Sequence, residues 1–88
     1  MKIKDGFLLR QVGGNNVVVP VGAQAVDFRC LITLNEVGAF LWQKLAVDCS
    51  VADLVEALLA EYDVTADIAT ADVERFVASL REKNLLDE

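Results

Sequence analysis

Short runs of β-branched and other apolar residues fill the first third of the chain. Residues 7–12 and 17–21 form two such runs, and residues 13–16 between them (Gly-Gly-Asn-Asn) tolerate positive φ at little cost. This pattern predicts a β-hairpin. Pro20 has no amide hydrogen to donate to a ladder, so we expect it at a sheet edge or a strand end. Residues 25–28 are a candidate for a further short strand.

A third strand is predicted over residues 31–34, just before the pattern changes. Side chains alternate between the two faces of a strand, so Ile32 and Leu34 lie on one face and Leu31 and Thr33 on the other. The simplest assembly of the three main runs is a three-stranded antiparallel sheet.

From Asn35 onward the apolar residues recur every three or four positions, which is the period of an amphipathic helix. The pattern predicts helices over residues 36–46, 51–62 and 66–83. A sheet followed by three helices in one small unit is an α+β fold.

The first helix has two candidate starts. Asn35 is a natural N-cap with Glu36 at the positive end of the helix dipole, but Thr33 and Glu36 also have the spacing of a capping box. Gly38 in the first turn costs up to about 1 kcal/mol of helix propensity relative to Ala. We expect a neighbouring backbone to approach it closely.

The second helix has the clearest start, because Ser50 and Asp53 have the spacing of a capping box. The third helix can begin after either Thr65 or Thr70, since both residues are plausible caps.

The end of the third helix is also marked in the sequence. Asn84 suits the left-handed position that follows a helix, and Leu85 then contacts Leu80 as in a Schellman motif.

Trp42 could lie in the core or at the surface of the first helix. The predicted buried stripes of the three helices are Val37, Phe40, Leu41 and Leu45, then Leu54, Val55, Leu58, Leu59 and Tyr62, then Val73, Phe76, Val77 and Leu80.

Length and charge narrow the class of protein. Eighty-eight residues with 55% apolar side chains predict one domain, residues 1–88, with a real core. Residues 1–35 contain four basic and two acidic side chains, whereas residues 36–88 contain four basic and twelve acidic ones. The acidic half keeps a small protein soluble or attracts a basic partner.

No run approaches the ~20 apolar residues of a membrane span, and no signal peptide is evident, so we expect a cytoplasmic protein.

The sequence lacks the groups on which most catalytic schemes depend. It contains no histidine, and Cys30 and Cys49 are spaced neither as a redox pair nor as a zinc set, so we expect them to be reduced. No phosphate-binding glycine motif occurs. Asp63 and Asp67 flank a helix start, which the helix dipole explains. We therefore expect neither enzymatic activity nor a metal or cofactor.

Five segments of the chain form a recognisable set. The most specific is Leu34-Asn35-Glu36-x-Gly38-Ala39 after a strand, and the others are Val17-Val-Val-Pro-Val-Gly22, Glu61-Tyr-Asp-Val64, Ala71-Asp-Val73 with Phe76, and Leu85-Leu86. Together they resemble the PqqD-like family, the relatives of coenzyme PQQ synthesis protein D that are also called precursor-peptide recognition elements, and the likeness covers about residues 6–86.

The resemblance implies a winged-helix-like fold and a non-catalytic adaptor. In such proteins the leader of a precursor peptide docks as an added strand beside the third strand and is covered by the third helix. The complex then presents the peptide to a modifying enzyme, often a radical SAM enzyme. By carry-over, the peptide-binding residues are Leu31, Ile32, Thr33 and Leu34 from the strand and Asp72, Arg75, Phe76 and Ser79 from the helix.

Several of these assignments have a purely structural alternative. Ile32, Leu34 and Phe76 are also explained as core residues, and Asp72 and Arg75 as solvated surface groups.

Other functions remain open at this point. A structural or regulatory interaction module would have the same pattern. The open strand could also pair with a second copy of the chain. A winged-helix nucleic-acid binder is disfavoured, because such proteins commonly neutralise about 6–10 phosphates and this chain has eight basic side chains among fourteen acidic ones.

Overall fold

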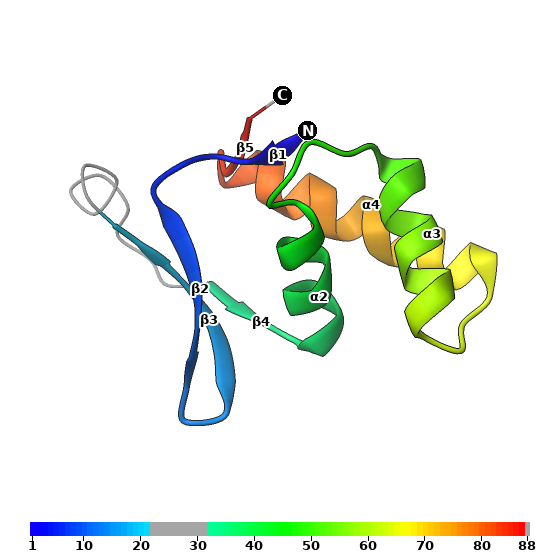
Figure 1. Ribbon diagram of the computed structural model, residues 1–88, viewed down its shortest axis with the longest axis horizontal. Helices are drawn as coiled ribbons and strands as arrows, with labels where there is room; N and C mark the ends of the chain where they lie inside the picture. The colour runs from blue at the N-terminus through cyan, green and yellow to red at the C-terminus, as the bar shows by residue number, and fades with distance from the viewer. Residues whose placement is uncertain (22–31, 88) are drawn as a thin grey trace.

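The computed structural model describes residues 1–21 and 32–87, and it joins a three-stranded antiparallel sheet to three helices (Figure 1). The predicted α+β class is therefore confirmed. The elements in chain order are β1 (Lys2–Ile3), β2 (Phe7–Val12), β3 (Asn15–Pro20), β4 (Ile32–Leu34), α2 (Glu36–Lys44), α3 (Val51–Glu61), α4 (Ala66–Glu82) and β5 (Leu86–Asp87).

The hairpin is tighter than the sequence pattern predicted. β2 and β3 are joined by Gly13 and Gly14 alone, at φ of +59° and +84°, and Val12 pairs directly with Asn15. Two adjacent glycines can take both positive-φ positions of a two-residue turn, so β3 begins at Asn15 rather than at residue 17. Pro20 ends β3 opposite Phe7, as expected for a residue that cannot donate to a ladder.

The main sheet has the strand order β2-β3-β4, and every pairing in it is antiparallel. β4 runs beside β3 with Thr33 opposite Val17, and the chain then turns into α2 (Figure 1). The predicted extra strand at residues 25–28 and the predicted strand residue Leu31 lie outside the described residues.

A second, two-stranded sheet was not predicted. β1 pairs with β5 antiparallel, with Ile3 opposite Leu86, and the two ends of the chain lie close together (Figure 1). The amide of Ile3 also donates to the Leu45 carbonyl at 3.0 Å, and that of Lys4 donates to the Leu85 carbonyl at 2.9 Å. Strands of two residues are too short to show an alternation of apolar and polar residues, so they cannot be predicted from the sequence pattern.

The helix starts follow the predicted caps. The Asn35 side chain accepts from the Gly38 amide at 2.7 Å, which makes Asn35 the N-cap of α2. Ser50 and Asp53 form the predicted reciprocal capping box of α3. Thr65, one of the two candidates, caps α4.

The end of α4 is a Schellman motif, as predicted. Asn84 takes the left-handed conformation at φ +60°, the Leu85 amide donates to the Leu80 carbonyl at 2.9 Å, and the Asn84 amide donates to the Arg81 carbonyl at 3.0 Å. Both leucines are buried. Each helix is shorter than predicted by one or two residues at its C-terminal end.

The core lies between one face of the sheet and the helices. Trp42 belongs to it, at 7% exposure, which resolves the question left open by the sequence. The predicted burial of Leu59 is wrong, because its side chain is 40% exposed on α3. Cys49 is a free, half-buried thiol, and Cys30 lies outside the described residues. The buried core cluster consists of Val18, Leu41, Trp42, Leu45, Leu54, Leu58, Ala69, Val73, Val77, Leu80, Leu85 and Leu86.

No helix in the described part of the chain is long and apolar enough to cross a membrane.

Candidate functional site

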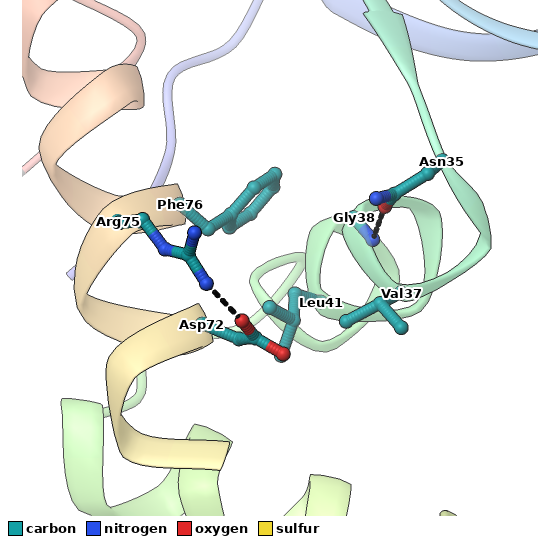
Figure 2. Close-up of a pocket in the computed structure, with 7 residues that line it drawn as sticks. All are labelled: Asn35, Val37, Gly38, Leu41, Asp72, Arg75 and Phe76. Carbon is teal, nitrogen blue, oxygen red and sulfur yellow. Dashed lines mark hydrogen bonds and ion pairs between the residues drawn. The ribbon is translucent and has the colours of Figure 1, made fainter. Parts of the chain in front are cut away.

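An open cavity of about 350 Å³ lies between the first turns of α2 and the middle of α4 (Figure 2). Its volume is in the range of ligand-binding clefts. The residues that line it are Asn35, Val37, Gly38, Leu41, Asp72, Arg75 and Phe76.

The α2 side of the cavity depends on Gly38. A Cβ at this position would lie 3.2 Å from the Asn35 Oδ1, 3.3 Å from the Leu34 Cβ and 3.4 Å from the Phe76 Cε1. The absence of a side chain therefore lets the phenyl ring approach the start of α2, as Figure 2 shows. Close approach was predicted here, but the neighbours are side chains rather than a backbone.

Apolar groups form the interior of the cavity. Leu41 is fully buried, and Val37 is half-buried one turn before it on α2. Phe76 is half-buried, packs against the core cluster and also lines the cavity. Phe76 is thus compatible with both of its assignments, to the core and to a pocket lining.

A charged pair forms the α4 rim. Arg75 and Asp72 form an ion pair one turn apart, with the arginine side chain 77% exposed and the aspartate 34% exposed (Figure 2). Exposed ion pairs contribute about 0–1 kcal/mol, so this one can open at little cost when another charged or polar group approaches. The cavity therefore combines an apolar interior with a polar rim that can adapt.

The open edge of the main sheet ends at this cavity. β3 is the sole strand paired with β4 among the described residues, and β4 leads through Leu34 to Asn35 at the cavity wall. The Leu34 Cβ lies close to Gly38, so strand and cavity are contiguous.

The register of the sheet identifies which groups of β4 face outward. In a two-residue hairpin the flanking pair, Val12 and Asn15, exchanges both hydrogen bonds, and bonded and non-bonded pairs then alternate. The bond from the Val21 amide to the Gly6 carbonyl, at 2.8 Å, follows this alternation. The β3 residues in non-bonded pairs with β2, which include Asn16 and Val18, therefore direct their N–H and C=O groups toward β4.

Asn16 and Val18 lie opposite Leu34 and Ile32, so these β4 residues direct their amide and carbonyl groups toward β3. Thr33 lies between them in a non-bonded pair with Val17. The N–H and C=O of Thr33 consequently face away from β3, toward the open edge.

The predicted site residues fall into three groups. Asp72, Arg75 and Phe76 line the cavity, and Thr33 is exposed at the open edge. Ile32 and Leu34 are half-buried and pack against the core cluster, in agreement with their alternative assignment. Ser79 is half-buried on α4, one turn beyond Phe76, and does not line the cavity; Leu31 is outside the described residues.

Four residues that line the cavity were not predicted as site residues. Asn35 was assigned only as a cap, Val37 and Leu41 only as core, and Gly38 only as a point of close approach. A glycine in the first turn of a helix was the one local signal that could have identified this wall, because it marks a place where another group must come near.

Other cavities lie elsewhere among the described residues. One of about 520 Å³ is bordered by β2 and the C-terminal half of α2, including Leu8 and Trp42. A cavity of about 330 Å³ lies around Met1 and Cys49, where burial raises the pKa of the thiol. The Cys49 thiol is therefore a weaker acid and a poorer nucleophile than an exposed cysteine. Neither of these cavities continues the open edge of β4, so we take the cavity of about 350 Å³ between α2 and α4 as the candidate site.

No group of three or more histidine, cysteine, aspartate or glutamate side chains gathers within residues 1–21 and 32–87 in a way that could hold a metal ion.

Comparisons with known proteins agree with this architecture. Residues 26–86, more than half of the chain, match the family described as coenzyme PQQ synthesis protein D (PqqD). A search of the curated proteins found no match.

Two solved structures share the fold over nearly the whole chain. One is TbiB1 in complex with the TbiA(beta) leader peptide, with a TM-score of 0.75 and 25% identity, covering 99% of this chain and 95% of that one. The other is a lasso peptide synthetase B1 complexed with the leader peptide, with a TM-score of 0.73 and 24% identity, covering 96% of this chain and 93% of that one.

Proposed function

Since the chain belongs to the PqqD family, we propose that it is a non-catalytic adaptor that binds the leader of a precursor peptide as a strand added to β4. The observation that carries this proposal is the continuity of an open strand edge with an apolar cavity. An extended peptide needs both features, because main-chain bonds hold it in register and a pocket selects its side chains. TbiB1, which shares the fold at 25% identity, is itself in complex with a leader peptide.

The cavity has to supply most of the binding energy. Thr33 offers one donor and one acceptor at the edge, and each hydrogen bond is worth about 0.5–1.5 kcal/mol net. Micromolar affinity requires about 8 kcal/mol. We therefore expect the peptide to place an apolar side chain against Phe76, Val37 and Leu41, while Asp72 and Arg75 meet its polar groups.

The bound peptide is presented to a modifying enzyme, which the family resemblance suggests is a radical SAM enzyme. The protein supplies register and orientation, and the enzyme supplies the chemistry. On this proposal the protein works in the cytoplasm, where ribosomally made precursors are available.

A proline substitution tests the strand-addition step. Dodecapeptides are selected on the wild-type protein from a random library displayed on phage, and their affinities are measured by calorimetry. Thr33→Pro deletes the outward-facing amide, so we expect binding to weaken by about fivefold to tenfold, as for one lost hydrogen bond and the added bulk of the ring. Backbone amide shifts of the wild-type protein should change around β4 and α4 on titration.

The matched control is Gln11→Pro on β2, the opposite edge of the sheet. Gln11 pairs with Asn16 in a non-bonded pair, so its amide also faces away from the sheet. This variant should bind the selected peptides as the wild type does, and circular dichroism should show both variants folded. Equal affinity of Thr33→Pro and wild type, or shifts confined to another surface, would reject strand addition at β4.

A separate experiment tests the enzyme partner. If a radical SAM enzyme is encoded beside this gene, it should co-elute with the protein in size-exclusion chromatography and should modify its substrate faster when the adaptor is present. Modification at the same rate without the adaptor would refute the presentation step while leaving peptide binding intact.

A further inference from the structure

Ile68 is an exposed apolar residue for which the fold gives no packing role. Its side chain is 53% exposed, and it is absent from both the core cluster and the half-buried residues packed against that cluster. A single exposed apolar side chain on a small protein is ordinary. What gives this one significance is the face of α4 on which it lies.

Helix geometry places Ile68 on the cavity side of α4. Successive residues turn by about 100°, so Ile68 lies within about 20° of Arg75 and about 40° of Asp72 around the helix axis. Both of those residues line the cavity. Phe76 lies about 80° from Ile68, between it and the core face formed by Ala69, Val73, Val77 and Leu80.

For a peptide that runs along α4, the axial position of Ile68 sets a distance along the bound chain. Ile68 precedes Phe76 by eight residues, which corresponds to about 12 Å along the helix. An extended peptide advances about 3.3 Å per residue, so the same distance spans about four residues. Side chains four positions apart in a strand point to the same side.

We propose that Ile68 is a second anchor point for the peptide, which receives an apolar side chain four positions from the one that occupies the cavity. This inference rests on the proposed function and specifies its substrate class. The ligand is an extended peptide with two apolar side chains in an i, i+4 relationship, separated at the rim by residues that meet the Asp72–Arg75 pair.

The test is a comparison of peptides selected on different variants from one random dodecapeptide phage library. On the wild-type protein, the enriched sequences should carry two apolar residues four positions apart. Selection on Ile68→Ser should enrich sequences that keep one apolar position and lose the preference at the other. The affinity of a wild-type-selected peptide for Ile68→Ser should fall by about tenfold, as expected for the loss of one buried aliphatic contact.

Leu59→Ser is the matched control. Leu59 is also exposed and apolar, at 40%, but it lies on α3, which contributes no residue to the cavity. This substitution should change neither the enriched sequences nor the affinity. Because Ile68 and Leu59 are both outside the core cluster, we expect both variants to fold.

The outcomes separate this inference from the proposed function. If Thr33→Pro weakens binding but Ile68→Ser leaves both affinity and sequence preference unchanged, the peptide pairs with β4 and Ile68 is ordinary surface. If no peptide is enriched, or if the enriched peptides shift no amide in β4, the proposed function itself fails. Equal losses of peptide affinity in Ile68→Ser and Leu59→Ser would show that any exposed apolar side chain has this effect, and they would overturn the anchor.

Discussion

The two faces of α4 differ in what holds their side chains in place. On one face Ala69, Val73, Val77 and Leu80 are all buried against the sheet and the other helices. On the other face, Ile68 is 53% exposed and the Arg75 side chain 77% exposed, and Arg75 forms an ion pair with Asp72. One side of the helix thus stabilises the fold, whereas the other is exposed at the rim of the cavity.

The largest expected effect is on the core face. Leu80→Ala should destabilise the protein by about 2–5 kcal/mol, because it leaves a cavity beside Leu85 at the end of the helix. Urea denaturation followed by circular dichroism measures this difference. A small domain has a total stability of about 5–10 kcal/mol, so Leu80→Val is a milder replacement if the alanine variant does not fold.

The neighbouring Ser79→Ala provides the contrast. Ser79 is half-buried outside the core cluster, and its hydroxyl accepts from the Lys83 ammonium at 3.2 Å. We expect a change within about 0.5 kcal/mol. A loss in Ser79→Ala comparable to that in Leu80→Ala would mean that the two faces do not differ in energetic role.

An intermediate effect is expected where α4 ends. Asn84 has a left-handed backbone, which costs a residue with a Cβ about 1–2 kcal/mol, and asparagine reduces this cost through local hydrogen bonding. Asn84→Gly should therefore be more stable than Asn84→Ala by about 1 kcal/mol in urea denaturation. Both changes remove the bond that the Asn84 Oδ1 accepts from the Lys4 Nζ at 2.8 Å, so that contribution cancels. Equal stabilities would show that the Schellman geometry is not maintained in solution.

An effect as small as that of Ser79→Ala is expected at the rim. Arg75→Ala removes an exposed ion pair, so the free energy of unfolding should change by about 0.5 kcal/mol or less. The midpoint of urea denaturation is the readout. A loss above about 1.5 kcal/mol would indicate that the pair supports the fold, and the contrast between the two faces would then be weaker than the burial suggests.

Local signals in the sequence predicted the fold well. The caps at Asn35, Ser50 and Thr65 and the left-handed Asn84 each depend on a few neighbouring residues. Ser50 and Asn84 were assigned without a competitor, whereas Thr33 competed with Asn35 and Thr70 with Thr65. The predicted hairpin loop, residues 13–16, was too long by two residues. Glycine and asparagine both tolerate positive φ, so the composition does not show whether two or four of these residues form the turn. Leu59 fits the helical period, but nothing in the remaining chain covers it.

The candidate site was predicted only in part, because it forms where distant segments meet. Asp72, Arg75 and Phe76 came from the resemblance rather than from any local pattern. Val37 and Leu41 have the spacing of ordinary core residues, and only the packing of α2 against α4 makes them part of a cavity wall. Phe76 packs against the core cluster and also lines the cavity. In the sequence, such a residue has the same helical spacing as one that lies only in the core.

The pairing of β1 with β5 has a consequence for folding kinetics. Ile3 and Leu86 are partners at the far ends of the chain, so their contact closes a loop of almost the entire protein and carries a large entropic cost. The β2–β3 hairpin and the α3–α4 pair need no such closure and can form first. A circular permutant that joins the present ends and opens at the Gly13–Gly14 turn would make the β1–β5 contact local and the β2–β3 contact distant, so we expect β1–β5 to form before β2–β3 in that variant.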